Sequence, residues 1–144
     1  MVIMSVDLGL VRTGVAVSDA GEVYAFPRTV IQERRADRLV EKISALAAEY
    51  QAGLIVVGYP KNMNGSVGER AETCAAIAEM IKEASGLETV LWDERCTTIS
   101  AYTTLNSNNV RGAKRKAAVD AEAACIILQD YLDFRKNTGK LQLT

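Results

Sequence analysis

The chain opens on MVIMSVDLGLVRTGVAVSDAG, residues 1–21, and this stretch decides the fold. An apolar run at 2–6 has strand character and ends on an acid, Asp7. After a glycine-containing turn, the β-branched alternation of 14–18 predicts a second strand, and a polar turn leads into a third strand at about 22–31. Three consecutive strands joined by short turns predict an antiparallel meander.

The rest of the chain alternates helix and strand. Apolar spacing predicts, in order, a helix at about 33–50, a strand at 54–57, a helix at 69–84, a strand at 88–92 and helices at 97–106 and 114–134. Gly53 is expected to end the first helix. This order predicts an α/β fold with a mixed five-stranded sheet, three antiparallel strands followed by parallel strands, and helices on both faces. We expect one domain over 1–144, with its core in 2–134 and a frayed polar tail at 135–144.

The composition restricts the chemistry. The 144 residues carry a formal net charge of −1 and no histidine, which excludes Ser-His-Asp and Cys-His catalysis and most zinc hydrolase sites. The three cysteines are far apart, and we expect small buried thiols in a reducing cytosol. No apolar run approaches the roughly 20 residues that a membrane span needs, and the sequence start resembles no secretory leader. We therefore expect a cytoplasmic protein without a membrane partner.

Acids fall at the predicted strand ends and on the last helix. Asp7 ends the first strand, Asp93 and Glu94 end the fifth, and Asp120 lies on the last helix, on the face expected to be buried. If the first and fifth strands are parallel neighbours, their terminal acids meet at one sheet edge. Three carboxylates in one cleft repel each other unless a cation neutralises them, and Mg²⁺ or Mn²⁺ prefers such ligands. Each acid taken singly also fits a solvated turn or a helix-dipole residue.

Four basic residues crowd the start of the last helix: Arg111, Lys114, Arg115 and Lys116. The helix dipole disfavours cations there, and a nucleic-acid phosphate would offset this cost, although a solvated basic turn is the plain alternative. The loop at 58–68 carries glycines just before a predicted helix and can form an anion site, to which Arg70 can add a phosphate fork.

Four ordered blocks resemble the YqgF family of pre-16S rRNA nucleases, also called Holliday junction resolvase-like proteins. The blocks are DLGLVRTGVAVSD (7–19), VVGYPKNMNGSVGERAE (56–72), WDERCTTISA (92–101) and KRKAAVDAEAACIILQDYLD (114–133). Two departures concern packing rather than chemistry: Tyr59 stands where the family often has a small aliphatic residue, and Ser5 where it commonly has glycine.

The resemblance implies an RNase H-like fold and a nuclease that matures a 5′ end of the ribosomal RNA precursor in bacterial cytoplasm. Its partners would be structured RNA and the ribosome or pre-ribosomal particle. The resemblance further implies that Asp7, Glu94 and Asp120 are the catalytic and metal-binding acids, holding Mg²⁺ or Mn²⁺, with Asp93 as the alternative to Glu94. The positions expected to face the substrate are Arg12, Asn64, Gly65, Arg70, Arg95, Thr98, Arg111, Lys114 and Lys116.

Three alternatives stay open. The first is a structure-specific resolvase of DNA junctions, because nothing in the residues separates the two substrates. The second is a fragment of a sugar kinase or ATPase, since residues 7–19 also resemble the phosphate-binding hairpin of actin and Hsp70-like ATPases, which need two such lobes. The third is a non-catalytic RNA-binding module for ribosome assembly. Either a monomer or a homodimer is compatible with the sequence.

Overall fold

The computed structural model describes residues 1–9, 11–59, 68–93 and 112–143, with only the backbone described at 59, 112–120 and 138–143. The strands are β1 (Val2–Asp7), β2 (Arg12–Ser18), β3 (Ala25–Gln32), β4 (Ala52–Tyr59) and β5 (Glu88–Asp93). The helices are α1 (Ala36–Glu49), α2 (Glu69–Ser85) and α4 (Gly112–Leu143). The helix predicted at 97–106 lies outside the described residues.

The strands form one mixed sheet in the order β3-β2-β1-β4-β5. β1, β2 and β3 pair antiparallel, whereas β4 runs parallel to both β1 and β5. The predicted mixed five-stranded sheet is therefore confirmed. The expectation that the first and fifth strands are neighbours is wrong, because β4 lies between them. β4 contains the uninterrupted apolar run Leu54–Val57, which is almost fully buried, and such a strand belongs in the sheet interior with both faces covered.

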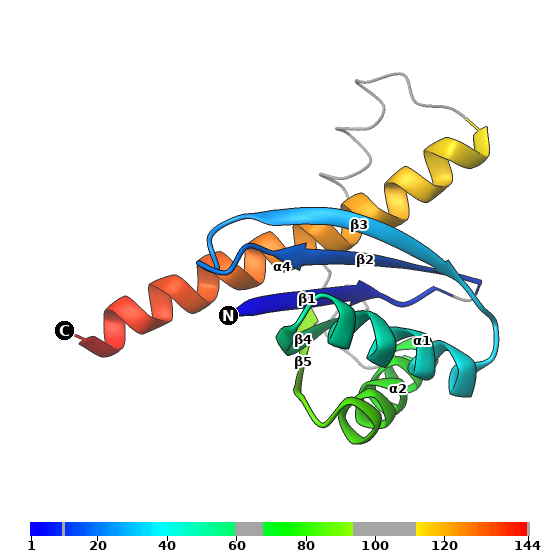
Figure 1. Cartoon of the computed structure of the whole chain (residues 1–144), viewed down its shortest axis with the longest axis horizontal. Coiled ribbons are helices and arrows are strands. Elements are labelled where there is room, and N and C mark those ends of the chain that lie inside the picture. Colours follow the sequence, from blue (N-terminus) through cyan, green and yellow to red (C-terminus); the bar gives the residue numbers. More distant parts are fainter. Residues whose placement is uncertain (10, 60–67, 94–111, 144) are drawn as a thin grey trace.

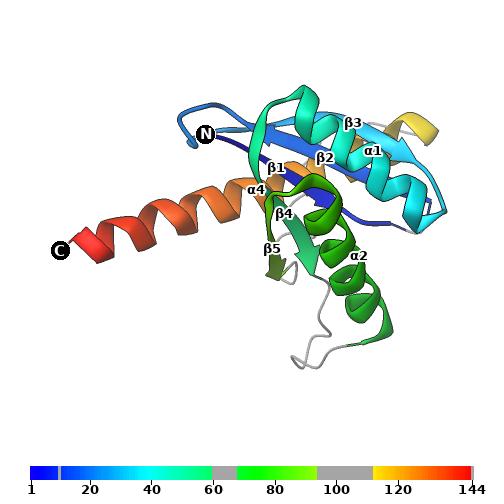
Figure 2. The same ribbon diagram turned by 60° about the horizontal axis from the view of Figure 1, so that its bottom comes forward.

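Helices cover both faces of the sheet, as predicted (Figures 1 and 2). α1 and α2 lie on one face over a core that includes Met4 and Val6 of β1. α4 lies on the other face over a core that includes Ile3 of the same strand. Successive side chains of a strand point to opposite faces, so β1 contributes apolar side chains to both cores.

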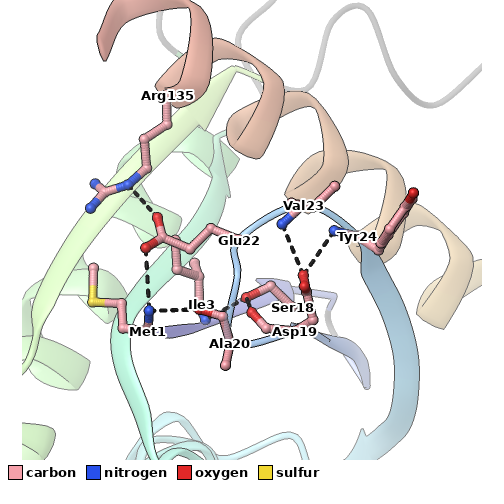
Figure 3. Close-up of polar contacts among 9 residues, drawn as sticks. All are labelled: Met1, Ile3, Ser18, Asp19, Ala20, Glu22, Val23, Tyr24 and Arg135. Carbon is pink, nitrogen blue, oxygen red and sulfur yellow. Dashed lines mark hydrogen bonds and ion pairs between the residues drawn. The ribbon is translucent and has the colours of Figure 1, made fainter. Parts of the chain in front are cut away.

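α4 is much longer than the strands on which it lies. Its 32 residues span about 48 Å, whereas the six residues of β1 span about 20 Å, so the helix projects beyond the sheet (Figures 1 and 2). The helix continues to Leu143, past its expected end near Phe134, so the tail expected to be frayed is helical up to that residue. Arg135 Nε donates to Glu22 Oε1 at 2.7 Å (Figure 3). The ring of Phe134 also lies 5.2 Å from that of Trp92, and the two contacts hold the helix at this point.

Among the helices that the structure describes, none combines the length and the apolar character needed to cross a lipid bilayer.

The end of α1 differs from the sequence expectation. The left-handed residue there is Gln51, with φ of 56°, and not Gly53, which lies inside β4. Gly53 packs closely against Met1, since a Cβ at position 53 would lie 2.7 Å from Met1 Sδ. The absence of a side chain at Gly53 therefore makes room for Met1, and Gly53 does not end the helix.

The predicted turn at 19–21 joins β2 to β3 (Figure 3). The carboxylate of Asp19 accepts hydrogen bonds from the backbone N–H groups of Val23 and Tyr24, at 2.8 and 2.9 Å. These two donors, with Tyr24 the stronger, hold the pKa of the Asp19 carboxyl below its ordinary value. The turn is thus closed by a charged side chain acting as a cap for the start of the next strand.

Candidate active site

Asp7 is the last residue of β1 and is half-buried. It pairs with Gly14 of β2, and β4 lies on the other side of β1. Because side chains alternate along a strand, Ile3, Ser5 and Asp7 share one face of β1. Ile3 packs in the core beneath α4, so Asp7 lies on the face of the sheet that α4 covers.

A buried hydrogen bond fixes how α4 crosses this face. Ser5 Oγ donates to the carbonyl oxygen of Ala124 at 2.7 Å, and both residues are fully buried. Farther along α4, Arg135 meets Glu22, whose carboxylate also accepts a hydrogen bond from the chain's terminal amine beside the start of β1 (Figure 3). α4 therefore runs opposite to β1. Asp120, of which only the backbone is described, precedes Ala124 by about one helical turn, toward the carboxyl end of β1.

Asp93, at the end of β5, lies farther from Asp7 than it would if β5 and β1 were neighbouring strands. Asp93 pairs with Tyr59 at the carboxyl end of β4. β5 is two strand spacings, or about 10 Å, from β1. Trp92 packs against the core beneath α4, so Asp93 belongs to the opposite face of the strand. Glu94 lies outside the described residues.

The turn that follows Asp7 is tight. A Cβ at Gly9 would collide with the carbonyl oxygen of Arg12, so only glycine fits there. The carbonyl oxygen of Val11 accepts a hydrogen bond from the N–H of Glu33 at 2.9 Å, which joins this hairpin to the end of β3. The backbone around Asp7 is thereby held at several points.

Two arginines predicted to face the substrate lie at the same end of the sheet as Asp7. Arg12 begins β2, is half-buried and pairs with Gln32 of β3. Arg70, in the first turn of α2, is exposed, and its Nη2 donates to the carbonyl oxygen of Leu8 at 3.0 Å. The structure thus brings both arginines to the carboxyl end of β1.

The other predicted substrate positions are described in part or not at all. Lys114 and Lys116 lie in the first turns of α4, where only the backbone is described. The remaining positions lie outside the described residues, namely Asn64, Gly65, Arg95, Thr98 and Arg111.

Two other acids at this end of the sheet are engaged with basic side chains. Lys42 Nζ donates to the Glu33 carboxylate at 3.1 Å, and this contact, with the backbone N–H of Arg35, holds the pKa of Glu33 below its ordinary value. Asp37 forms an ion pair with Arg35 at 3.0 Å, which likewise lowers the pKa of Asp37. Both carboxylates already have cationic partners, so neither is a good candidate for a metal ligand.

The described thiols do not suit nucleophilic chemistry. Cys74 is buried in the core under α1 and α2, as expected for a small apolar side chain. Burial, and to a lesser degree the charge of Glu122, raises the pKa of Cys125 to about 11, so this thiol stays protonated at neutral pH. Cys96 lies outside the described residues.

Among the side chains that the structure describes, no three Asp, Glu or Cys residues gather into a group that could hold a metal ion. Glu94 and the side chain of Asp120 are not in that set.

Sequence reasoning missed two contacts at this site. Ser5 is visible in the sequence only as a departure from a glycine that is common in the family, with no signal for its partner Ala124. Arg70 is visible as a cation near a glycine-rich loop, with no signal for the Leu8 carbonyl. In both cases the acceptor is a backbone oxygen, which any residue carries, so the sequence could not identify it.

Two relatives are similar to this chain over nearly its whole length. A protein of Desulfitobacterium hafniense is 43% identical over 141 residues, which cover 97% of this chain and 98% of that protein. A protein of Thermoanaerobacter pseudethanolicus is 41% identical over 138 residues, which cover 95% of this chain and 99% of that protein. Both relatives are named "Putative pre-16S rRNA nuclease".

Solved Holliday junction resolvases share the fold. The RuvC protein of Thermus thermophilus, solved in complex with a Holliday junction substrate, has a TM-score of 0.62 at 12% identity and covers 96% of this chain and 98% of its own. The fowlpox virus resolvase, solved with Holliday junction DNA, has a TM-score of 0.55 at 12% identity and covers 92% and 97%. The implied RNase H-like fold is thereby confirmed.

The family comparison agrees with the resemblance to YqgF proteins. The RuvX family, described as Holliday junction resolvase, matches residues 1–134. This match covers all the described strands, α1, α2 and most of α4. With two full-length relatives above 40% identity, this chain belongs to the RuvX family.

Proposed function

We propose that this chain is a metal-dependent nuclease that hydrolyses a phosphodiester bond in structured nucleic acid, and that it processes the 5′ end of pre-16S rRNA. Asp7, Glu94 and Asp120 are its catalytic and metal-binding acids. The observation that carries the proposal is the register between β1 and α4, fixed by the hydrogen bond from Ser5 to Ala124.

The register supports a shared site for Asp7 and Asp120. From Ser5 to Asp7 the strand rises by about 6.6 Å, and from Ala124 back to Asp120 the helix rises by about 6 Å. Because α4 runs opposite to β1, the two steps go in the same direction. Ser5 and Asp7 share a strand face, and Ala124 and Asp120 share a helix face. Two acids far apart in sequence therefore belong to facing positions on neighbouring elements.

The alternation of β5 favours Glu94 over Asp93 as the third acid. Trp92 faces the α4 side of the sheet, as Asp7 does, and Asp93 belongs to the other face. Asp93 therefore faces away from the side of the sheet that carries Asp7, which leaves Glu94 as the proposed third acid.

The chemistry of the donor set fits a hard divalent cation. The three acids offer only oxygen ligands and the chain has no histidine, which suits Mg²⁺ or Mn²⁺. Such ions, bound as a pair, polarise a phosphoryl oxygen and activate water. The chain's own part is to orient Asp7 at the end of β1 and to bind the substrate backbone. Arg12 and the basic first turns of α4, with Lys114 and Lys116, bind its phosphates.

Precursor ribosomal RNA is the proposed substrate because the full-length relatives at 41 and 43% identity carry that name. This substrate implies the cytoplasm as the place of action and the pre-ribosomal particle as a partner. A second candidate is a resolvase of four-way DNA junctions, which the description of the family favours. Cleavage of a precursor rRNA fragment and a four-way DNA junction, side by side at equal concentration, decides between the two substrates.

The Asp7→Asn variant tests the chemistry. It should abolish cleavage and retain binding of the nucleic acid, because it removes one metal ligand and leaves the basic residues in place. Mn²⁺ should raise the Tm of the wild type and not that of Asp7→Asn, since a ligand stabilises the native state that binds it.

Asp19→Asn is the matched control, because Asp19 is an acid at the other end of β2. It should cleave at the wild-type rate. Wild-type cleavage by purified Asp7→Asn would overturn the proposal.

A further inference from the structure

The peptide that follows Asp7 is held by a long-range contact. Arg70 Nη2, on α2, donates to the carbonyl oxygen of Leu8 at 3.0 Å across 62 positions of sequence. The side chain of Leu8 is 5% exposed and belongs to the core under α1 and α2. The residue next to the proposed metal ligand is therefore fixed on two sides, by its buried side chain and by a charged donor on its carbonyl.

We propose that Arg70 is a positioning residue: it holds the Leu8 peptide and thereby fixes the direction of the Asp7 carboxylate. This inference rests on the proposed role of Asp7. It replaces the expectation that the Arg70 guanidinium mainly binds a phosphate of the substrate.

The sheet alone does not constrain this peptide. β1 pairs with β4 up to Val6 and with β2 up to Asp7, so the ladder of strand pairs ends at the acid itself. Beyond that point the turn is shaped by the close approach of Gly9 to Arg12 and by the bond from Arg70. A guanidinium donor to a carbonyl makes a charge-assisted hydrogen bond, which is stronger than a neutral one. Its loss frees the Leu8–Gly9 peptide bond, which lies one residue beyond Asp7.

The contact also couples two parts of the chain. Arg70 is the second residue of α2, whose N-cap is Gly68. A shift of the start of α2 would therefore move the guanidinium that holds the Leu8 carbonyl.

The two roles of Arg70 predict different results. A phosphate contact adds to substrate affinity, and its loss weakens binding and reduces the salt slope by about one. A positioning contact leaves binding unchanged and lowers the rate of the chemical step, because loss of an outer partner of a metal ligand typically costs about 10- to 100-fold in metal affinity or activity.

The experiment compares Arg70→Ala and Arg70→Lys with the wild type on the full chain. Single-turnover cleavage at saturating substrate should fall about 10- to 100-fold in Arg70→Ala. Arg70→Lys keeps one donor and should recover part of the rate. Binding of the uncleaved nucleic acid without divalent metal, measured over a range of salt, should keep its affinity and its slope. Weaker binding with a slope reduced by about one would overturn the proposal.

Hydrogen exchange gives a readout that does not depend on activity. The amides of Leu8, Gly9 and Val11 should exchange faster in Arg70→Ala, whereas the amides of α1 should not change. Unchanged exchange at the hairpin would overturn the proposal even if cleavage fell. Should Asp7→Asn cleave like the wild type, the proposed function fails, and the exchange data still report whether Arg70 holds the turn.

Arg38→Ala is the matched control. Arg38 is an exposed arginine in the first turn of α1, and α1 begins at the same end of the sheet. Among the described residues, no acid lies within ion-pair distance of it. This variant should change neither the exchange of the hairpin nor the single-turnover rate. A fall in that rate as large as that of Arg70→Ala would mean that charge at this end of the protein, and not the contact with Leu8, is responsible.

Discussion

Ser5 of β1 and Ala124 of α4 are joined by a buried hydrogen bond of 2.7 Å, in which the serine hydroxyl donates to the helix carbonyl. The two residues are 119 positions apart. The bond links the strand that carries Asp7 to the helix that carries Asp120, so it fixes the register of the helix on the strand. A glycine at position 5 could not make this contact.

Ser5→Ala should lower the free energy of unfolding by about 1 kcal/mol, because it removes one buried hydrogen bond. It should also lower cleavage activity, since α4 loses a buried polar link that fixes its register on β1. Urea unfolding and a cleavage assay measure the two effects.

Ser85→Ala is the matched control for Ser5→Ala. Ser85 Oγ also donates to a carbonyl at 2.7 Å, but to Ile81 within its own helix, and it accepts a hydrogen bond from the N–H of Leu87 at 3.2 Å. These contacts are local to the end of α2, so this variant should lose about 1 kcal/mol at most and keep full activity. An equal loss of activity in both variants would contradict the special role of Ser5.

Gly9→Ala should destabilise the protein by about 1 to 3 kcal/mol, because the new methyl group meets the backbone carbonyl of Arg12 and backbone cannot move aside cheaply. Cleavage should fall sharply, since the displaced turn follows Asp7. Gly53→Ala is the comparison. Its methyl group meets the flexible thioether of Met1, which can swing away, so thermal unfolding should show a much smaller change.

Asp19→Asn should lose stability at neutral pH and lose less as the pH falls. The N–H groups of Tyr24 and Val23 lower the pKa of Asp19 in the folded state. A depressed pKa contributes stability that is present above the unfolded value near pH 4 and is lost as the pH falls through the lower folded value. Urea unfolding from pH 7 to pH 3 should therefore show the two curves converging.

Asp19→Ala tests whether the charge or the acceptor matters. It removes both, so part of its deficit should persist at low pH, because a carboxyl that has taken up a proton still accepts hydrogen bonds through its carbonyl oxygen. A gap between wild type and Asp19→Asn that does not depend on pH would contradict the assignment of the effect to the carboxylate.

Gln51→Gly should raise the free energy of unfolding by about 0.5 to 1 kcal/mol. Gln51 has φ of 56° just after α1, a left-handed conformation that disfavours a residue with a Cβ and does not disfavour glycine. The strain that the substitution relieves in the folded state exceeds the cost of the extra conformational entropy that glycine gives the unfolded chain. Gln32→Gly is the control, because Gln32 is also exposed but lies in β3. The same change there should destabilise by a similar amount.

Much of the fold could be predicted from local pattern. The alternation of β1 and β2 and the uninterrupted apolar run Leu54–Val57 gave the strands and the burial of β4. The acid at the end of the first strand was identified for the same reason, because a strand pattern that stops at a carboxylate marks the edge of the sheet. The last helix was expected to bury one face, and Ala124 and Ile127 of α4 are fully buried.

The site could be predicted only in part. Asp7 was expected at the end of its strand and lies there, and Arg12, which the family resemblance indicated, lies at the same end of the sheet. The bond from Arg70 to the Leu8 carbonyl was not predictable, because a backbone oxygen has no signature in the sequence. The same holds for the acceptor of the Ser5 hydroxyl.

The sequence by itself determined most of the strands and helices, which of their faces are apolar and which residues are candidate metal ligands, because these properties depend on each residue and its near neighbours. Only the tertiary structure decided that β4 separates β1 from β5 and that Gln51, not Gly53, bends the end of α1. It also decided which backbone carbonyls receive the side chains of Ser5 and Arg70. These outcomes depend on which segments, distant in sequence, pack against each other and which hydrogen-bond partners they find there. The local sequence pattern does not contain that information.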